Sequence, residues 1–502
     1  MGKGGSVSVK EGAAMFEDAS VNTGAVEWPD PDSAYFAVRK MQVKLHRWAT
    51  EDSGRRFGDL YNLVCDPAFL VNAWERVSSN KGSRTPGVDR ATVAKIETRV
   101  GVEAFLRDVR EQVKSRTFHP VEVRQVVIPK ASGKVRKLGI PTVTDRVVQA
   151  ALKAVLEPIF EADFQPCSYG FRPNRRAQDA VAEIHHMASR SYEWVLEADI
   201  EACFDNIDHV VLMDKVRSRV SDKRVLGLVK AFLKSGVMTT TGNREEALTG
   251  TPQGGILSPL MANIALSLLD EHFAQQWEQE MRTWRQRSKR RRNGEANYQL
   301  VRYADDFVVV VSGERRHAER LREQVAEVLA PLGLRLSPEK TRVVHIDEGF
   351  DFLGFRIRRM RKRGTAKSYV YTMPSKKAIA SIKDKVRSKT SRSTLHQSLA
   401  DLLRSLGRTL RGWANYFRHG VSKAAFNAID SYVWERIARW VRRKHNRVGW
   451  PELRRRFCDR GWRFASDGVY FTGASSVAVT RYRYRGSTIP TPWTPKPTAA
   501  IG

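Results

Sequence analysis

The clearest indication of the fold is Gln299-Leu-Val-Arg-Tyr-Ala-Asp-Asp-Phe-Val-Val-Val-Val311. Two apolar runs, rich in β-branched residues, flank two adjacent acids, which predicts a buried β-hairpin with Asp305 and Asp306 at its turn. A second apolar run, Trp194-Val-Leu-Glu-Ala-Asp199, is typical of a buried strand that also ends in an acid. The sequence therefore presents three carboxylates at the ends of apolar strands.

Carboxylates on rigid strands suit phosphoryl transfer. This reaction needs little covalent help, but the charge on the attacking oxygen, the leaving oxygen and the phosphate must be neutralised. Two hard cations about 3.5–4 Å apart neutralise it, and carboxylates are their natural ligands. An adjacent Asp-Asp pair is equally typical of a solvated turn, so the segments around it must decide between the two interpretations.

The composition indicates a polyanionic partner. The 502 residues contain 86 Lys and Arg against 55 Asp and Glu, a net charge of +31, which is far more than solubility requires. Because the basic residues alternate with aromatic ones, nucleic acid is favoured over a membrane surface. No run of about 18 uncharged apolar residues is present that could span a bilayer.

The ends and the cysteines indicate a reducing compartment. The first 25 residues lack the basic start and apolar core of a secretory signal, so the cytoplasm is the expected location, with association to the nucleoid through the substrate. The four cysteines are far apart and form no C-x-x-C pair. This spacing argues against both a disulfide framework and a zinc site.

Between about residues 80 and 358 the chain resembles the reverse transcriptase family in the order and detail of its segments. Tyr303-Ala-Asp-Asp306 resembles the signature turn of that family, and Asp199 followed by Phe204-Asp205 resembles its first metal-binding strand. The stretch Thr251-Pro-Gln-Gly-Gly-Ile-Leu-Ser-Pro-Leu-Met-Ala-Asn263 resembles the segment beneath the incoming nucleotide. The resemblance implies an RNA-directed DNA polymerase that uses two Mg²⁺ ions.

The same resemblance assigns roles to individual residues. Asp199, Asp305 and Asp306 would be the catalytic metal ligands, and Ile200 would contribute a backbone carbonyl. Lys340, in Leu-Ser-Pro-Glu-Lys-Thr, would donate a proton to pyrophosphate. The dNTP would be bound by four residues: Lys130, Arg136, Phe204 and Gln253. The primer would be gripped by Phe352, Leu353 and Gly354.

Each nucleotide-binding assignment has a physical reason. An aromatic plate at Phe204 leaves no room for a ribose 2′-hydroxyl, a role that is compatible with simple core packing. The guanidinium of Arg136 suits phosphate oxygens in pairs, although Lys130 and Arg136 would also fit an exposed charged hairpin. Gln253 stands beside Gly254 and Gly255, where a backbone can approach a nucleotide closely.

The flanking segments select a subclass. Residues 80–89, 145–149 and the stretch Tyr169-Gly-Phe-Arg-Pro-Asn-Arg175 resemble the extended fingers of intron-encoded enzymes. The stretch Arg411-Gly-Trp-Ala-Asn-Tyr-Phe-Arg418 resembles the maturase region, or domain X, which implies a group II intron enzyme. No paired Cys and His residues follow residue 460, so second-strand DNA cleavage by this chain is not expected.

Two helices are predicted in the maturase-like region, each with an apolar and a basic face. The apolar residues recur at three- and four-residue steps, which indicates one buried stripe per helix. A solvated surface is the alternative for the basic faces, but their scarcity of acids favours RNA phosphate. The predicted RNA-binding residues are Arg404, Arg408, Arg411, Asn415, Arg418, Arg436, Arg439, Arg442 and Arg443.

The predicted fold is α/β followed by all-α: a right-hand polymerase whose fingers and palm contain a small antiparallel sheet plus helices, then an α-helical thumb. The expected divisions are a leader at 1–55, fingers at 56–190, a palm at 191–370 with a basic insertion near 280–295, a thumb or domain X at 371–460, and a basic tail at 461–502. The last of these, from about residue 481, is expected to be disordered.

The expected partners are the group II intron RNA, an RNA template with its DNA primer, target DNA and dNTPs, without a membrane. The oligomeric state is left open, a homodimer included. The predicted function is copying of the intron RNA into DNA during retrohoming, together with assistance in splicing. Two alternatives stay open: a domesticated enzyme that acts in DNA repair or phage defence, and a maturase that only assists splicing.

Overall fold

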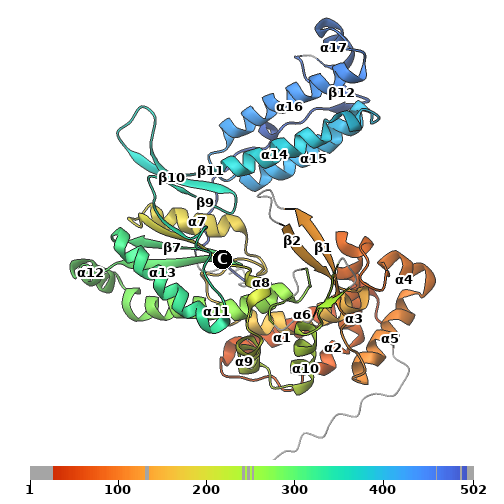
Figure 1. Ribbon diagram of the computed structural model, residues 1–502, viewed down its shortest axis with the longest axis vertical. Coiled ribbons are helices and arrows are strands. Elements are labelled where there is room, and N and C mark those ends of the chain that lie inside the picture. The colour runs from red at the N-terminus through yellow and green to blue at the C-terminus, as the bar shows by residue number, and fades with distance from the viewer. Residues whose placement is uncertain are drawn as a thin grey trace, which may run out of the picture.

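The computed structural model describes residues 27–129, 135–239, 243–245, 249–251, 254–459, 461–486 and 489–494. Figure 1 shows three regions around a central space: helices and a hairpin on one side, a sheet covered by helices on the other, and a group of helices above both. These correspond to fingers, palm and thumb. The predicted right-hand polymerase architecture is therefore confirmed.

The fingers are mainly helical, with a small sheet in the order β2-β1-β4-β5. Their long helix α6 (Val143–Glu161) is buried on nearly all sides, because it packs against α1, α2 and α3. The predicted hairpin is present, with Arg124 opposite Ile140 and Pro129 opposite Val135. The remaining elements are α1 (Pro31–Glu51), α2 (Tyr61–Val64), α3 (Pro67–Ser78), η1 (Lys81–Arg84), α4 (Val93–Arg99), α5 (Val102–Lys114), β1 (Val123–Pro129), β2 (Val135–Ile140), α9 (His209–Arg219), α10 (Lys223–Leu233), β4 (Val237–Met238) and β5 (Arg244–Glu245).

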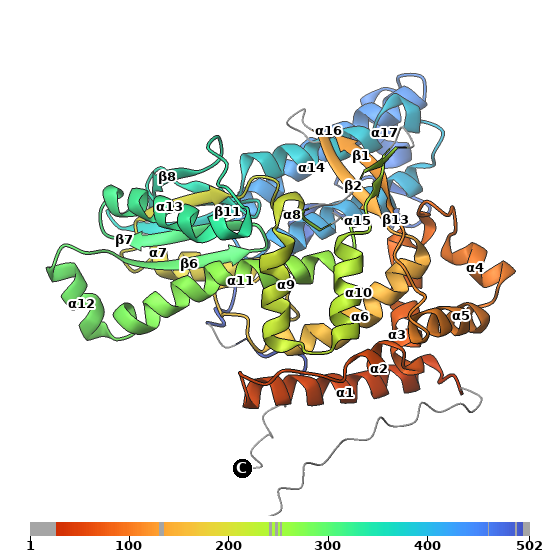
Figure 2. The ribbon, with the colours of Figure 1, turned by 60° about the horizontal axis from the view of Figure 1, so that its bottom comes forward.

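Helix α1 forms most of the described part of the expected leader at 1–55. It begins after Asp30, whose carboxylate accepts hydrogen bonds from the backbone N–H groups of Asp32 and Ser33 at 3.0 Å each, as an N-cap residue does. Its inner face packs on α3 and α6, and Figure 2 shows it along one edge of the molecule.

The palm sheet has the strand order β6-β7-β3-β8, with every neighbouring pair antiparallel. Its strands are β3 (Trp194–Asp199), β6 (Asn297–Tyr303), β7 (Asp306–Ser312) and β8 (Arg342–His345). Alternate residues of β7 belong to different cores: Phe307, Val309 and Val311 pack in one cluster, and Val308 and Val310 in another. Because both faces are covered, the strands are apolar at consecutive positions.

Helices cover both faces of this sheet. Helix α13 contacts β3, β7 and β8, whereas α7 contacts β6 and β7. The other palm elements include a second sheet of three antiparallel strands that leads into the thumb. The elements not yet given are α7 (Ala177–Ala188), α8 (Cys203–Asn206), α11 (Ser258–Gln276), η2 (Trp277–Met281), α12 (Trp284–Arg292), α13 (Arg315–Leu329), η3 (Ala330–Leu332), β9 (Phe350–Phe352), β10 (Phe355–Arg361) and β11 (Ser368–Pro374).

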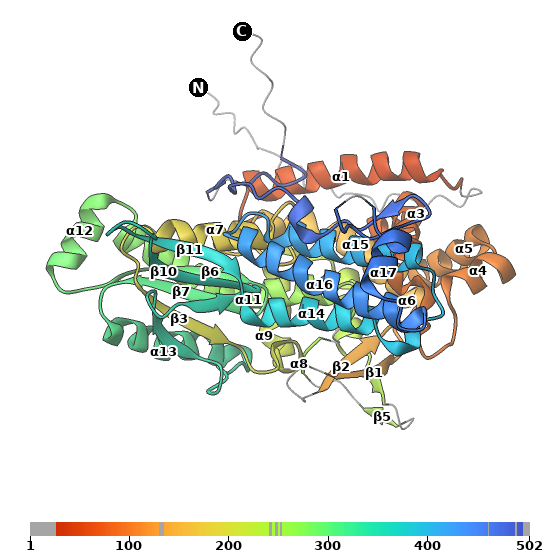
Figure 3. The ribbon, with the colours of Figure 1, turned by 90° about the horizontal axis from the view of Figure 1, so that it is seen from above.

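The thumb helices lie side by side (Figures 1 and 3) around a third core. Both predicted apolar stripes are buried there or against the palm, with Trp413 partly exposed. The predicted α-helical thumb is confirmed, and a short hairpin follows its last helix, in the segment that the sequence assigns to the tail. Its elements are α14 (Lys376–Lys389), η4 (Arg392–Thr394), α15 (Leu399–Phe417), α16 (Lys423–Lys444), α17 (Trp450–Phe457), β12 (Ala465–Ser466), β13 (Val469–Tyr470) and η5 (Ala474–Ser476).

The prediction of a disordered C-terminal tail is wrong for residues 481–486 and 489–494. This segment, which we call the C-terminal strap, buries Ile489 and Trp493 to 5% and 4% exposure. The Trp493 indole N–H donates to Gln42 Oε1 of α1 at 3.1 Å, and Figure 3 shows the strap beside that helix. Composition alone missed it because its few apolar and aromatic residues find partners only in the folded protein.

The described helices contain none that is both long and apolar enough to cross a membrane.

Candidate active site

The three predicted catalytic carboxylates come together at one end of the palm sheet. Strand pairing places Asp199, the last residue of β3, opposite Asp306, the first residue of β7. Strands β6 and β7 are joined by a two-residue turn, Ala304-Asp305, in which Ala304 has φ of 59°. Such a left-handed residue lets a tight turn follow the twist of its strands. Asp305 is thus held beside the other two acids.

The electrostatics confirm that these acids are close neighbours. Burial raises the pKa of Asp305, and the nearby charge of Asp199 raises it further. Burial and the charges of Asp305 and Asp199 together raise the pKa of Asp306 to about 6. The three carboxylates therefore destabilise one another when all are ionised, a situation that a bound cation relieves.

Lys340, the predicted proton donor, lies at this cluster. Its Nζ is 2.5 Å from Asp199 Oδ2, and this hydrogen bond raises the pKa of Lys340. In the chain as described, no group of three or more His, Cys, Asp and Glu side chains is arranged tightly enough to hold a metal ion. The donor set nevertheless fits a hard divalent cation, because it supplies carboxylate oxygens from three strand ends.

A buried arginine that the sequence did not single out supports the catalytic turn. Arg302 on β6 has no exposed surface, and its guanidinium donates to Ala304 O at 2.9 Å and to Asp270 Oδ1 of α11 at 2.7 Å. It also donates to Asn263 Oδ1 at 3.0 Å and to Ser168 Oγ at 2.8 Å. Burial would lower the pKa of Arg302, but the charge of Asp270 keeps it raised. The arginine is therefore a charged clamp on the turn.

The stretch that begins at Tyr169 packs directly against the catalytic turn. A Cβ at Gly170 would lie 2.3 Å from the backbone nitrogen of Ala304, so only glycine fits there. The carbonyl of Gly170 accepts a hydrogen bond from Asn263 Nδ2 at 2.9 Å, and the Tyr169 N–H donates to Arg302 O at 2.8 Å. The stretch that begins at Tyr169, which resembles a family motif, therefore fixes the position of the catalytic turn by packing against it.

Phe204 lies in the short helix α8, which begins four residues after Asp199. Its side chain is half-buried and its ring centroid is 6.3 Å from that of Phe171, edge to face. The Thr251 N–H donates to Phe204 O at 2.6 Å. A Cβ at Gly250, which has φ of +79°, would lie 2.5 Å from the same carbonyl. The predicted sugar plate and the predicted nucleotide loop are therefore in contact.

The finger hairpin approaches the carboxylates across the central space. Arg136 lies on β2, and its charge is one of the groups that lower the pKa of Asp305, so the two side chains are near enough to interact. Gly254 packs on the same strand, where a Cβ would lie 2.5 Å from Gly139 O. The predicted nucleotide-binding residues Lys130 and Gln253 lie outside the described residues.

Two further predicted residues, Ile200 and Gln149, connect neighbouring segments of the site. Ile200 is buried and forms an isolated antiparallel bridge with Leu336, which extends β3 past Asp199. Gln149 of α6, in the predicted extended fingers, is buried, and its Oε1 accepts a hydrogen bond from the Ile256 N–H at 2.8 Å. Gln149 thereby anchors the nucleotide loop to the fingers.

The predicted primer-grip turn joins the palm to the thumb. Phe352 ends β9, and the turn residues Leu353 and Gly354 have φ of 48° and 80°, as a tight turn between twisted strands requires. The Tyr416 hydroxyl donates to Leu353 O at 2.9 Å, and the Phe417 ring packs on Phe355 at 4.8 Å between centroids. The aromatic half of the maturase-like motif is thus the joint between palm and thumb.

The predicted RNA-binding residues of the thumb fall into two groups. Arg404, Arg408, Arg411, Asn415, Arg439 and Arg443 are exposed. Arg436 and Arg442 have internal partners instead: Arg436 Nε donates to Thr390 Oγ1 at 2.9 Å, and Arg442 Nε donates to Val448 O at 3.1 Å. Arg418 caps α15, and its carbonyl accepts from the Thr480 N–H at 3.0 Å. Among the exposed residues, Arg404 pairs with Asp401 and Arg439 with Glu435, whereas Arg408, Arg411 and Arg443 form no ion pair within the described residues.

Comparisons with known proteins agree with these features. Residues 128–357 match the model for reverse transcriptase (RNA-dependent DNA polymerase), and residues 379–462 match the group II intron, maturase-specific domain. The chain is 37% identical to protein YkfC of Escherichia coli over 359 residues, 68% of this chain and 93% of that protein.

A second relative and a solved structure show weaker similarity. The chain is 31% identical to the group II intron-encoded protein LtrA of Lactococcus lactis over 369 residues, which is 64% of this chain and 60% of LtrA. Among solved structures, telomerase from Candida albicans, in complex with a TWJ fragment of telomeric RNA, matches at a TM-score of 0.37 with 15% identity. That match covers 70% of this chain and 66% of the telomerase chain.

Proposed function

Because the chain belongs to the reverse transcriptases of the group II intron maturase family, we propose that it copies its intron RNA into DNA and binds that RNA to assist splicing. The observation that carries this proposal is the junction of Asp199, Asp305 and Asp306 beneath the finger hairpin and beside the thumb joint. Reverse transcription at the site of insertion would complete retrohoming, with target DNA as a further partner.

We propose that Asp199, Asp305 and Asp306 hold two Mg²⁺ ions. When bound, such ions neutralise charge on the attacking and leaving oxygens of an in-line displacement. The chain supplies the positions: β3 and β7 fix two carboxylates by pairing, and Arg302 fixes the turn that carries the third. Lys340 would give a proton to the pyrophosphate that leaves, and its position 2.5 Å from Asp199 supports this role.

The nucleotide would lie between the palm and the finger hairpin. Arg136 would contact the triphosphate, because its charge already acts on Asp305 and guanidinium forks fit phosphate oxygens in pairs. The Phe204 ring would lie under the sugar, where an apolar plate disfavours a 2′-hydroxyl. The half-buried position of this ring, next to Thr251, supports a deoxyribonucleotide substrate.

The maturase activity would use the exposed basic row of α15. Arg404, Arg408 and Arg411 are exposed on the side opposite the apolar stripe. Arginines in this setting bind phosphate oxygens of structured RNA, with release of counterions. The primer-grip turn joins the same helix through Tyr416, so RNA held by the thumb would be aligned with the palm.

The test is the substitution Asp305→Asn, which removes one ligand charge and keeps the side chain's size. Primer extension on an RNA template should fall by about a thousandfold or more, because the metal cluster acts mainly in the transition state. RNA affinity should stay within about twofold. Asp214→Asn, an exposed substitution on α9, is the matched control. Full extension by Asp305→Asn would refute the site assignment.

A further inference from the structure

The basic insertion of the palm forms a helix whose charged side chains fall into two groups. One group makes contacts within the protein, and the other is exposed. Residues 281–294 contain seven Lys and Arg and no acid. Part of this sequence forms α12, which opens with a capping box between Thr283 and Gln286. The helix has no buried residue, so neither an apolar core nor intrinsic pairing of opposite charges explains its composition.

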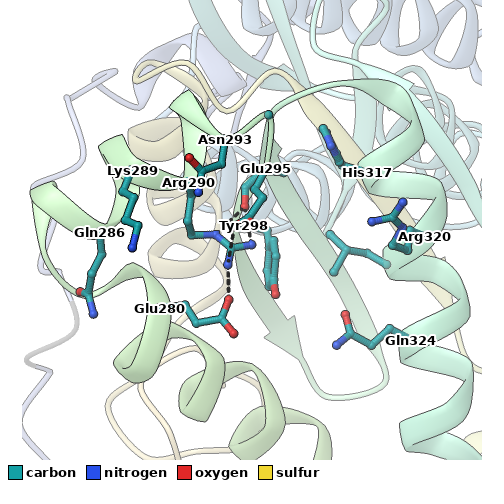
Figure 4. Close-up of a pocket in the computed structure, with 13 residues that line it drawn as sticks. Glu280, Gln286, Lys289, Arg290, Asn293, Glu295, Tyr298, His317, Arg320 and Gln324 are labelled. Atoms are coloured by element: carbon teal, nitrogen blue, oxygen red, sulfur yellow. Dashed lines mark hydrogen bonds and ion pairs between the residues drawn. The ribbon is translucent and has the colours of Figure 1, made fainter.

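Two of its arginines hold the helix in place. Arg290 pairs with Glu280 and Glu295 and donates to Ala296 O at 3.1 Å. Arg287 donates to Met281 O at 2.6 Å, and its guanidinium lies 5.6 Å from the Trp277 ring centroid. Figure 4 shows Arg290 turned toward Glu280 in a cavity of about 630 Å³ between α12 and α13. These inward arginines fix the orientation of α12.

The other basic residues are exposed, and one of them, Lys289, also lines that cavity (Figure 4). We define the α12 patch as five exposed residues: Trp284, Arg285, Lys289, Arg291 and Arg292. In the part of the chain that the structure describes, none of the four cations forms an ion pair. Like charges four residues apart on a helix repel one another, as Arg285 and Lys289 must. Trp284, at the start of the helix, is 70% exposed.

The patch is remote from the catalytic carboxylates. Strand β6 begins at Asn297, just after α12, and ends at Tyr303 beside the catalytic turn. Seven residues in a strand extend about 20 Å, so the two sites are at opposite ends of the sheet. Figure 1 shows α12 at the end of the palm farthest from the thumb and the finger hairpin. The α12 patch therefore does not lie along the space between fingers, palm and thumb.

We propose that the α12 patch binds a second segment of RNA while a template and primer occupy the active site. The proposal rests on the proposed function, because a large folded intron RNA would extend beyond the central space. The four cations would contact backbone phosphates, and Trp284 would stack on an unpaired base at the end of a duplex. An exposed aromatic ring beside arginines favours nucleic acid over an acidic protein, because a base can stack on the ring while the arginines bind the neighbouring phosphates.

The experiment uses the full chain with a short template–primer already bound. A labelled RNA hairpin of about 20 base pairs with an unpaired loop is then titrated at several salt concentrations. Arg285→Glu with Lys289→Glu should lower hairpin affinity about tenfold or more and make the salt dependence less steep by about 1 to 2 in log–log slope. Trp284→Ala should lower affinity several-fold without changing that slope, because stacking releases no counterions.

The control is Lys223→Glu with Lys230→Glu, which reverses two exposed charges on α10 and should leave the hairpin affinity unchanged. Extension of the bound primer should be normal in all variants, which shows that they fold and tests the proposed function separately. Hairpin affinity equal to that of the control pair would overturn the proposal. Two other results would also overturn it. One is that a DNA hairpin of the same sequence binds as tightly as the RNA hairpin and loses as much affinity in the variants. The other is that polyglutamate displaces the RNA as effectively as unlabelled hairpin does.

Discussion

Arginine has opposite uses in the palm and in the thumb. Arg302 in the palm is fully buried and donates to Asp270, Asn263, Ser168 and the carbonyl of Ala304. The arginines at positions 408 and 411 of α15 are exposed, and within the described residues neither forms an ion pair. Arg302 therefore fixes the geometry of the palm, whereas Arg408 and Arg411 of the thumb are available for a partner.

This difference separates two kinds of mutational effect. A buried charge whose partner is removed is left unpaired, which destabilises a protein by about 3–5 kcal/mol. An exposed unpaired charge can be reversed at a cost of less than about 0.5 kcal/mol, and the effect is seen in binding.

The largest effect should come from Arg302→Met. This change leaves Asp270 buried without its partner and removes the donor to Ala304 O, so we expect a loss of about 3–5 kcal/mol in the free energy of unfolding and a fall in kcat of about a hundredfold or more. Denaturant unfolding and primer extension measure the two effects.

The double variant Arg302→Met with Asp270→Leu shows whether Arg302 positions the catalytic turn or only stabilises the fold. Replacing both partners by apolar residues should restore most of the stability, but kcat should stay low, because Ala304 O still lacks its donor. Recovery of kcat together with stability would show that Arg302 only holds the fold together.

The next effect concerns pH. Asp306 has its pKa raised to about 6 by burial and by Asp305 and Asp199, so the folded state binds more protons than the unfolded state between about pH 4 and 6. Without metal, the free energy of unfolding should therefore fall as the pH rises through this range, by less than the full pKa shift implies, because the Asp306 side chain is exposed and water screens its charge. Asp306→Asn should lack this loss and be the more stable protein at pH 7 in EDTA.

Added Mg²⁺ provides the control for this titration. It should raise the stability of the unmodified protein at pH 7 by more than that of Asp306→Asn, because only the former has the full set of carboxylates. Identical pH profiles for the two proteins would contradict the assigned coupling.

A smaller effect is expected from Arg408→Glu with Arg411→Glu. RNA affinity should fall about tenfold near physiological salt, and its salt dependence should weaken, while the free energy of unfolding should change by less than about 0.5 kcal/mol. Intron splicing at low magnesium should fall further than extension on a short template–primer. Equal losses in the two assays would assign this row to the polymerase duplex alone.

The smallest effect should come from the C-terminal strap, which connects the two regions. Arg485 Nε donates to the buried Asp179 of α7 at 2.8 Å, and the Tyr482 hydroxyl donates to the same carboxyl oxygen at 2.7 Å. Because Tyr482 remains in Arg485→Ala, we expect a loss of only about 1 kcal/mol in the free energy of unfolding, with normal extension. A loss of several kcal/mol would show that palm and thumb do not act separately.

Some properties of this protein were determined by local sequence. The apolar runs that end in Asp199 and flank Asp305 and Asp306 predicted β3, β6 and β7, because strand periodicity and turn chemistry depend on neighbouring residues. The stripes of α15 and α16 were equally clear, because helical periodicity needs only one face to be buried. The positions of the three acids followed, since a strand end places its last side chain at the edge of a sheet.

Other properties were decided by tertiary structure alone. Arg302 resembles any charged residue in a strand until packing places Asp270, which is 32 residues away, against it. The basic sequence near residue 290 reads as uniform, yet Arg290 is paired and Arg292 is exposed. The strap looked disordered because its partners on α1 and α7 are more than 300 residues away. Contacts between distant segments depend on how the cores pack, and no local pattern encodes them.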